Sequence, residues 1–218
     1  MSSSRRIGVL VSGRGSNLQA LLDAAKAGTL GGEIVVVVCN IPGAYALERA
    51  AKAGVPSAVV DHKQYKDRAS FDAALVAALK SARVDLVCLA GFMRIVGKTF
   101  LDAFPGAVLN IHPSLLPSFP GLHAHRQALE AGVKITGVTV HFVDAGTDSG
   151  PIVIQAAIPV LPGDDEDSLG DRVLEAEHRI YPWAVHAVAT GKARIEERRV
   201  VVDGADADRA AKLFNPRP

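Results

Sequence analysis

Asn110 and His112 stand two residues apart at the end of an apolar run that begins at Ala107. In an extended strand alternate side chains share a face, so the amide and the imidazole are expected side by side. An amide N–H can stabilise an oxyanion and an imidazole can move a proton, a pairing that suits attack on a carbonyl group. The spacing alone also fits a histidine that only bonds a backbone carbonyl, and that alternative stays open.

A glycine-rich turn near the start of the chain, Gly13-Arg14-Gly15-Ser16-Asn17, is the second candidate site. It joins an apolar run to a segment with helical spacing. Glycines allow close backbone approach, and a helix start offers unpaired N–H groups, which together suit a phosphate. A dinucleotide fingerprint is disfavoured, because Leu18 occupies its third glycine position and no acidic residue closes the next apolar run. A phosphate monoester is favoured over a turn without a ligand.

The elements that carry these candidates alternate between two periodicities. Short apolar runs predict strands at residues 7–11, 34–39, 58–60, 84–90 and 107–111, and helical spacing predicts helices at 16–27, 44–53 and 68–81. Ser16 is the expected N-cap of the first helix. Such alternation predicts an α/β fold, a mostly parallel twisted sheet of Rossmann type with helices on both faces. Ligands of these sheets bind at the carboxyl ends of the strands, where both candidates lie.

The pattern changes after His112. A proline-rich loop at 113–121 precedes a short helix at 125–131 and two longer strands at 135–143 and 152–160, expected as an antiparallel addition to the same sheet. A long helix at 167–189 with a kink at Pro182, a last strand at 194–202 and a short helix or tail at 206–213 complete the expectation. Since no linker or repeat is visible, residues 1–202 are predicted to form one catalytic domain, and 203–218 an unassigned tail.

Composition limits the class of protein and of partner. The chain has 218 residues, 49% of them hydrophobic and 22% charged, typical of a globular protein and unlike a disordered chain, collagen or coiled coil. Its formal net charge of +1 favours a small substrate over a nucleic acid. Cys39 and Cys88 lie in apolar runs and are expected to be buried free thiols, which fits a reducing cytoplasm. Neither a signal peptide nor an apolar run of membrane-spanning length is evident.

Two stretches resemble the folate-dependent formyltransferase superfamily: Asn-Ile-His-Pro-Ser-Leu-Leu-Pro from Asn110, and Asp-Ala-Gly-Thr-Asp-Ser-Gly-Pro-Ile from Asp144. Residues 11–19, 90–95 and 121–128 further resemble the branch that formylates glycinamide ribonucleotide. The resemblance runs from about residue 6 to about residue 200. We expect neither the C-terminal tRNA-binding domain of methionyl-tRNA formyltransferases nor the N-terminal regulatory domain of formyltetrahydrofolate deformylases.

The resemblance implies an activity and a catalytic trio. A formyl group would pass from the co-substrate 10-formyltetrahydrofolate to the amine of glycinamide ribonucleotide, in de novo purine biosynthesis. The matching catalytic positions are Asn110, His112 and Asp148. Asn110 would hold the formyl oxygen, His112 would donate or shuttle a proton, and Asp148 would keep His112 protonated, because a nearby carboxylate favours the imidazolium.

The resemblance also implies binding residues. Gly15, Ser16 and Asn17 match the phosphate-binding turn, and Glu177 matches the acid that binds the ribose hydroxyls. The expected folate-side residues are Arg68, Met93, Arg94, Ile95, Val96, Asn110, Asp144, Ala145, Gly146, Thr147 and Asp148. Val96 stands where the family commonly has leucine, which trims an apolar wall.

The same residues also permit other interpretations. A hydrolase that releases formate from 10-formyltetrahydrofolate, or a binding module without chemistry, would share the fold. A metal site at His112, His123 and His125 is disfavoured because the partner spacing is missing. His141 fits a substrate-lining or a core position equally well. We expect small-molecule substrates, no nucleic acid or membrane partner, and a monomer or homodimer.

Overall fold

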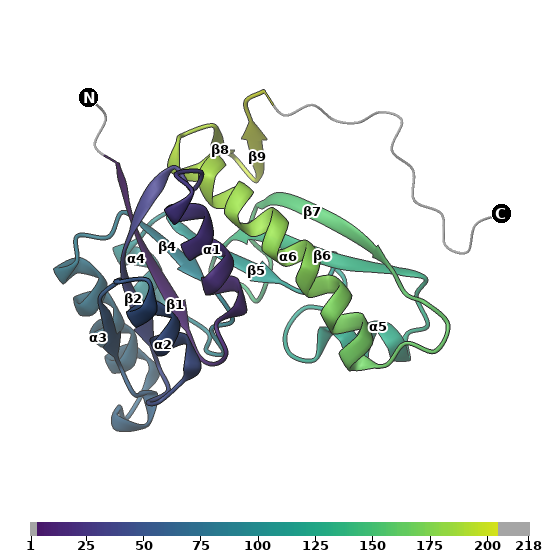
Figure 1. The fold of residues 1–218 in the computed structure, drawn as a ribbon, viewed down its shortest axis with the longest axis horizontal. Coiled ribbons are helices and arrows are strands. Elements are labelled where there is room, and N and C mark those ends of the chain that lie inside the picture. The colour runs from purple at the N-terminus through teal and green to yellow at the C-terminus, as the bar shows by residue number, and fades with distance from the viewer. Residues whose placement is uncertain (1–3, 205–218) are drawn as a thin grey trace.

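The computed structural model describes residues 4–204, and a mostly parallel sheet forms its centre (Figure 1). Within the described residues the sheet has seven strands in the order β3-β2-β1-β4-β5-β6-β7. The parallel strands are β1 (Arg5–Val11), β2 (Gly32–Cys39), β3 (Ser57–Val59), β4 (Leu86–Leu89) and β5 (Val108–His112). Two antiparallel strands, β6 (Ile135–Phe142) and β7 (Ile152–Pro159), complete it. The predicted fold class and the antiparallel addition are confirmed.

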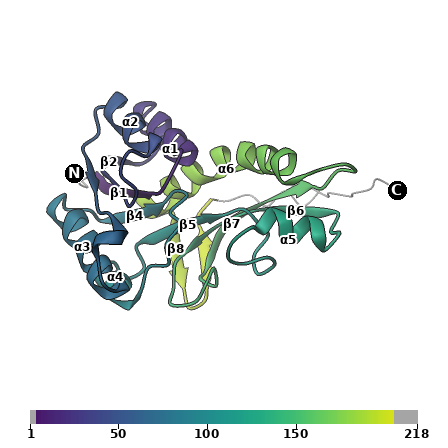
Figure 2. The ribbon, with the colours of Figure 1, turned by 90° about the horizontal axis from the view of Figure 1, so that it is seen from below.

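Helices cover both faces of this sheet (Figure 2). One face carries α1 (Ser16–Lys26), α2 (Tyr45–Lys52) and α6 (Glu166–Ala189), and the other carries α3 (Arg68–Ser81) and α4 (Lys98–Ala103). The short α5 (Ala124–Glu130) contacts α6. Alternate residues of β1 supply the two cores: Val9 packs on the α1 side and Leu10 on the α3 side. Burial on both faces explains the continuous apolar runs in the sequence.

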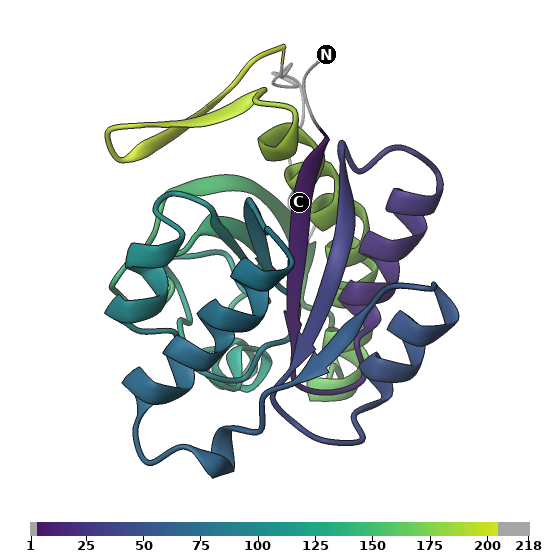
Figure 3. The same cartoon turned by 90° about the vertical axis from the view of Figure 1, so that its left-hand side faces the viewer.

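Two local expectations are wrong, and two short elements were not expected. The run at 194–202 is a hairpin of β8 (Ala193–Glu196) and β9 (Arg199–Val202), a separate small sheet (Figure 3). Its turn passes through Glu197 at a φ of 56°, with none of the Gly, Pro or Asn residues that usually mark a turn. Ser16 is the first helical residue of α1, because Gly15 is the N-cap. The α4 helix and a 3-10 turn at His62–Gln64 were not expected.

Other expectations have mixed outcomes. Pro182 lies inside α6, which continues to Ala189. Cys39 and Cys88 are buried and free, as predicted, and burial raises the pKa of the Cys88 thiol to about 12. Between residues 4 and 204 no helix is both long and apolar enough to span a membrane. The expected helix at 206–213 lies outside the described residues, and the domain boundary at residue 202 stays a prediction.

Candidate active site

The carboxyl end of β5 carries Asn110 and His112 on one face, and the loop between β6 and β7 brings Asp148 to them. The His112 Nδ1 atom lies 3.4 Å from Asp148 Oδ2, and Asn110 Nδ2 lies 3.5 Å from Asp148 Oδ1. His112 is 5% exposed, so the cluster is largely shielded from water. The three residues expected to be catalytic therefore form one contact group.

Both ring nitrogens of His112 face oxygen acceptors. Nε2 lies 2.9 Å from the Phe119 carbonyl oxygen, which can only accept, so Nε2 carries a proton. Nδ1 faces the Asp148 carboxylate, also an acceptor. At this distance the carboxylate forms an ion pair with the ring when both ring nitrogens carry a proton. His112 thus contacts a backbone carbonyl, as in the alternative interpretation of this histidine, and it contacts the Asp148 carboxylate as well.

Asp148 is held in place by its backbone and by a neighbouring loop. Its φ of 52° lies in the left-handed region, which is uncommon for residues other than glycine, asparagine and aspartate. Its Oδ2 atom accepts the Gly121 N–H at 2.8 Å, which ties it to the end of the proline-rich loop. The same oxygen faces His112, so the loop and the imidazole share one carboxylate oxygen.

His141 belongs to this cluster as well. It pairs with Asn110 across β5 and β6, and its Nδ1 lies 2.9 Å from the Phe142 carbonyl oxygen, so Nδ1 carries the proton. Burial lowers the pKa of His141, although the Phe142 carbonyl and the Asp148 charge oppose that shift. A neutral ring leaves Nε2 free to accept from Asn110 Nδ2, 3.2 Å away. His141 is both buried and in contact with the site, and this contact orients the Asn110 amide.

The glycine-rich turn lies between β1 and α1. Gly15 has a φ of 70°, and a Cβ there would lie 2.8 Å from the Ala46 Cβ, so only glycine fits. Asn17, in the first turn of α1, donates through Nδ2 to Glu177 Oε2 at 2.6 Å. The structure therefore brings the expected ribose-binding acid against the expected phosphate-binding turn.

The segment at residues 93–97 is anchored from two sides. Ser12 Oγ accepts the Met93 N–H at 2.8 Å and donates to Asn40 Oδ1 at 2.6 Å. Asp72 Oδ2 accepts the Gly97 N–H at 2.8 Å. Burial raises the pKa of Asp72, while the Gly97 bond and the Arg68 charge lower it. Ser12 and Asp72 thus fix a segment expected to contact folate.

The expected folate-side residues differ in exposure. Met93 and Ile95 are 67% and 63% exposed, which leaves them available to a ligand. Val96 is instead 7% exposed and packs in the core with Phe71 and Phe100. Its side chain therefore belongs to the core, and its expected contact with folate stays a prediction.

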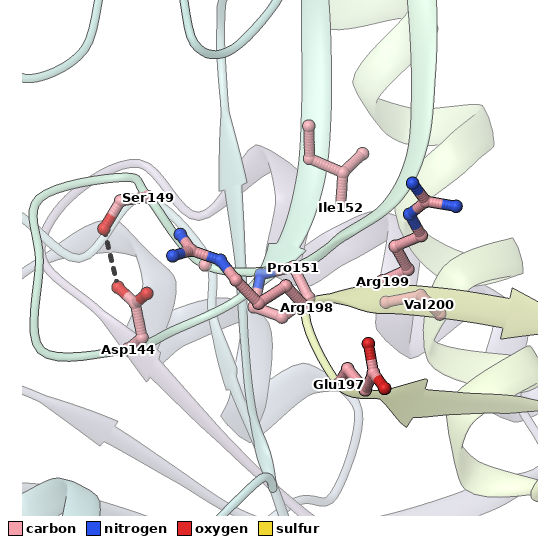
Figure 4. Close-up of a pocket in the computed structure, with 9 residues that line it drawn as sticks. Asp144, Ser149, Pro151, Ile152, Glu197, Arg198, Arg199 and Val200 are labelled. Atoms are coloured by element: carbon pink, nitrogen blue, oxygen red, sulfur yellow. Dashed lines mark hydrogen bonds between the residues drawn. The ribbon is translucent and has the colours of Figure 1, made fainter.

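A cavity lies beside the 144–150 loop (Figure 4), and Asn110 is not among its lining residues. It has a volume of about 800 Å³ and lies between Asp144 and Ser149 on one side and the turn of the β8–β9 hairpin on the other. A smaller cavity of about 310 Å³ includes Thr147 and Asp148 in its lining. Both cavities are bordered by Arg198.

Across residues 4–204 no group of three or more His, Cys, Asp or Glu side chains is placed to hold a metal ion.

The family described as formyl transferase matches residues 5–185. The chain belongs to the formyl transferase family. It is 43% identical to the phosphoribosylglycinamide formyltransferase of Escherichia coli K12, over 90% of this chain and 92% of that protein. The resemblance drawn from the sequence motifs is thereby confirmed.

The chain is also similar to a much longer protein and to a protein of known crystal structure. The trifunctional purine biosynthetic protein adenosine-3 of Drosophila melanogaster is 52% identical over 88% of this chain, but the chain spans only 14% of that protein's length. The crystal structure of glycinamide ribonucleotide transformylase 1 from Symbiobacterium toebii superposes with a TM-score of 0.91 at 54% identity, covering 93% of this chain and 95% of that one.

Sequence reasoning did not single out Ser12, Asn40, Arg49 or Asp72, all of which hold backbone or side-chain groups of the candidate site. Ser12 had a usable signal, since it is a hydroxyl residue directly between a buried strand and the glycine-rich turn. Arg49 and Asp72 had none, because their partners lie on other elements of the chain.

Proposed function

We propose that the chain transfers the formyl group of 10-formyltetrahydrofolate to the amine of glycinamide ribonucleotide, a step of de novo purine biosynthesis. The observation that carries the proposal is the buried contact of His112 with Asp148, with Asn110 beside them, in a chain of the formyl transferase family. The match over nearly the full length of the E. coli phosphoribosylglycinamide formyltransferase supports the choice of acceptor.

The proposed chemistry is a formyl transfer through a tetrahedral intermediate. The acceptor amine attacks the formyl carbon and forms the new C–N bond, while the carbonyl oxygen gains negative charge. Asn110 donates an Nδ2 hydrogen to that oxygen. The hydrogen directed at Asp148 is available for this, because its 3.5 Å contact is long for a hydrogen bond, whereas the His141 contact is 3.2 Å.

Proton movement completes the transfer. The bond from the formyl carbon to N10 of the folate breaks, N10 receives a proton, and the acceptor nitrogen loses one. His112, as the imidazolium, is the proton donor, and Asp148 stabilises its charged form. The two proton movements cancel, so His112 regains its proton by the end of the cycle.

Substrate binding is assigned to two regions. The acceptor phosphate binds at Gly15, Ser16 and Asn17, where the N-terminus of α1 favours an anion, and the ribose hydroxyls bind Glu177. The folate co-substrate binds along Arg68, residues 93–96, Asn110 and residues 144–148. The co-substrate is the only cofactor in this account, the partners are these small molecules, and the expected location is the cytoplasm.

Product analysis tests the proposal. Incubation of the protein with 10-formyltetrahydrofolate and glycinamide ribonucleotide is expected to yield the N-formylated acceptor and tetrahydrofolate in equal amounts, as read by mass spectrometry. Release of free formate in place of the formylated acceptor would favour the deformylase alternative.

A further inference from the structure

Arg49, on α2, holds the glycine-rich turn from outside. Its Nε donates to the Arg14 carbonyl oxygen at 2.9 Å, and its Nη1 donates to Gln19 Oε1, also at 2.9 Å. The N–H of Ala46, one turn earlier on α2, donates to the Gly13 carbonyl oxygen at 3.1 Å. Two successive carbonyl groups of the turn therefore point toward α2.

The direction of these carbonyl groups also fixes the direction of the N–H groups in the same peptides. In a planar trans peptide the C=O and the N–H point in opposite directions. Because the carbonyls of Gly13 and Arg14 face α2, the N–H groups of Arg14 and Gly15 face away from it. Gly13 and Arg14 are exposed and Gly15 is half-buried, so the turn is accessible to a ligand.

The positive charge of Arg49 strengthens its hold on the Arg14 carbonyl. A hydrogen bond from a charged donor is stronger than one between neutral groups, so this carbonyl is held firmly. The Tyr45 ring lies beneath the guanidinium, with the Arg49 Cζ 4.9 Å from the ring centroid, which restricts the side chain further. The guanidinium is thus fixed by two hydrogen bonds and one ring contact.

We propose that Arg49 is a positioning residue for the acceptor phosphate: by bonding the Arg14 carbonyl, it aims the Gly15 N–H at the phosphate. Arg49 acts through the peptide and does not itself bind the ligand. This inference rests on the proposed function, which assigns the phosphate to the turn.

The side chain that this role requires is a planar fork. Arginine presents several donors in fixed directions, which lets one side chain bond both the Arg14 carbonyl and Gln19. A lysine at the same position keeps the positive charge but has a single nitrogen. Arg49→Lys therefore separates the orienting effect from simple electrostatic attraction.

The test compares two acceptors across three proteins. kcat/KM is measured for glycinamide ribonucleotide and for its dephosphorylated riboside, with the wild type, Arg49→Lys and the control Lys52→Ala. The control removes a positive charge from the same helix, where Lys52 is exposed and contacts Glu48 at 3.9 Å. Thermal unfolding of each protein is recorded alongside.

Arg49→Lys is expected to lower kcat/KM roughly 10-fold for the phosphorylated acceptor and to leave the riboside unchanged, since one charge-assisted contact is at stake. Lys52→Ala is expected to change neither. The proposal would be overturned if Arg49→Lys kept the wild-type preference for the phosphorylated acceptor, or if it lowered kcat/KM equally for both acceptors. It would also be overturned if Lys52→Ala lowered kcat/KM as much as Arg49→Lys does. A wild type that does not distinguish the acceptors would instead refute the phosphate site itself, and Arg49 with it.

Discussion

Asn17 donates a 2.6 Å hydrogen bond to Glu177, which joins the first turn of α1 to the middle of α6 across 160 positions of sequence. Glu177 is 8% exposed, and burial raises the pKa of its carboxyl group, an effect only partly offset by the Asn17 bond. The folded protein thus holds a carboxylate that is costly to keep charged. Such a group is commonly retained at functional sites, where a ligand compensates for it.

Glu177→Gln is expected to raise stability and lower acceptor binding. In the wild type, the free energy of unfolding falls as pH rises from the ordinary glutamate pKa to the raised pKa of Glu177, because the folded state binds the extra proton there. Above that pH range the folded protein bears the full free-energy cost of burying the charged Glu177 carboxylate. In Glu177→Gln the free energy of unfolding no longer falls with pH over this range. The glutamine amide can also donate to the unpartnered Asn17 oxygen.

Urea unfolding across this pH range measures the stability effect, and steady-state kinetics measures the acceptor KM. The KM is expected to rise roughly 10-fold, since the ribose hydroxyls lose a charged acceptor. A variant no more stable than the wild type at neutral pH, or one with an unchanged KM, would contradict this account of Glu177.

His112→Ala and Asn110→Ala are each expected to lower kcat while the folate still binds. Loss of a general acid costs roughly 10²–10⁴-fold, and loss of an oxyanion donor roughly 10²–10³-fold. Stopped-time assays at saturating substrates give kcat, and circular dichroism checks the fold. Rates close to wild type in either variant would exclude that residue from the chemistry.

Ser12→Ala is expected to raise the KM for the folate co-substrate with little change in kcat. The substitution leaves the Met93 N–H and the Asn40 side-chain oxygen without the hydroxyl that joins them, which releases one anchor of residues 93–97. A KM increase of roughly 10-fold corresponds to the loss of about one buried hydrogen bond.

The matched control for this prediction is Ser12→Thr, which retains the hydroxyl and is expected to restore the KM. If the alanine variant raises only the KM of the acceptor, Ser12 acts on the glycine-rich turn and not on the folate segment.

The sequence predicted most of the fold because its signals were local. Apolar runs bounded by glycine and proline located β1 to β5, and alternation in the Thr- and Val-rich run located β6. The motifs likewise identified Asn110, His112 and Asp148, which lie together in the structure. The resemblance, not spacing, supplied Asp148, since nothing local ties a loop residue to β5.

The missed features depend on contacts between distant segments. The α4 helix has only six residues, too few for a helical period to be evident. The β8–β9 turn uses Glu197 in a left-handed conformation that composition does not indicate. The partners of Arg49 lie 35 and 30 positions away, and those of Ser12 lie 28 and 81 positions away. Only the folded chain shows which backbone groups these side chains hold.

Formyl transfer, unlike hydrolysis, requires an amine acceptor, so the dependence of co-substrate consumption on that acceptor separates the two reactions. Loss of 10-formyltetrahydrofolate is followed by absorbance with the wild-type protein, first alone and then with glycinamide ribonucleotide. Rapid loss, stoichiometric with the acceptor, is expected only in the second case. Equal loss without the acceptor would contradict formyl transfer and identify a hydrolase, and no loss in either case would identify a binding protein.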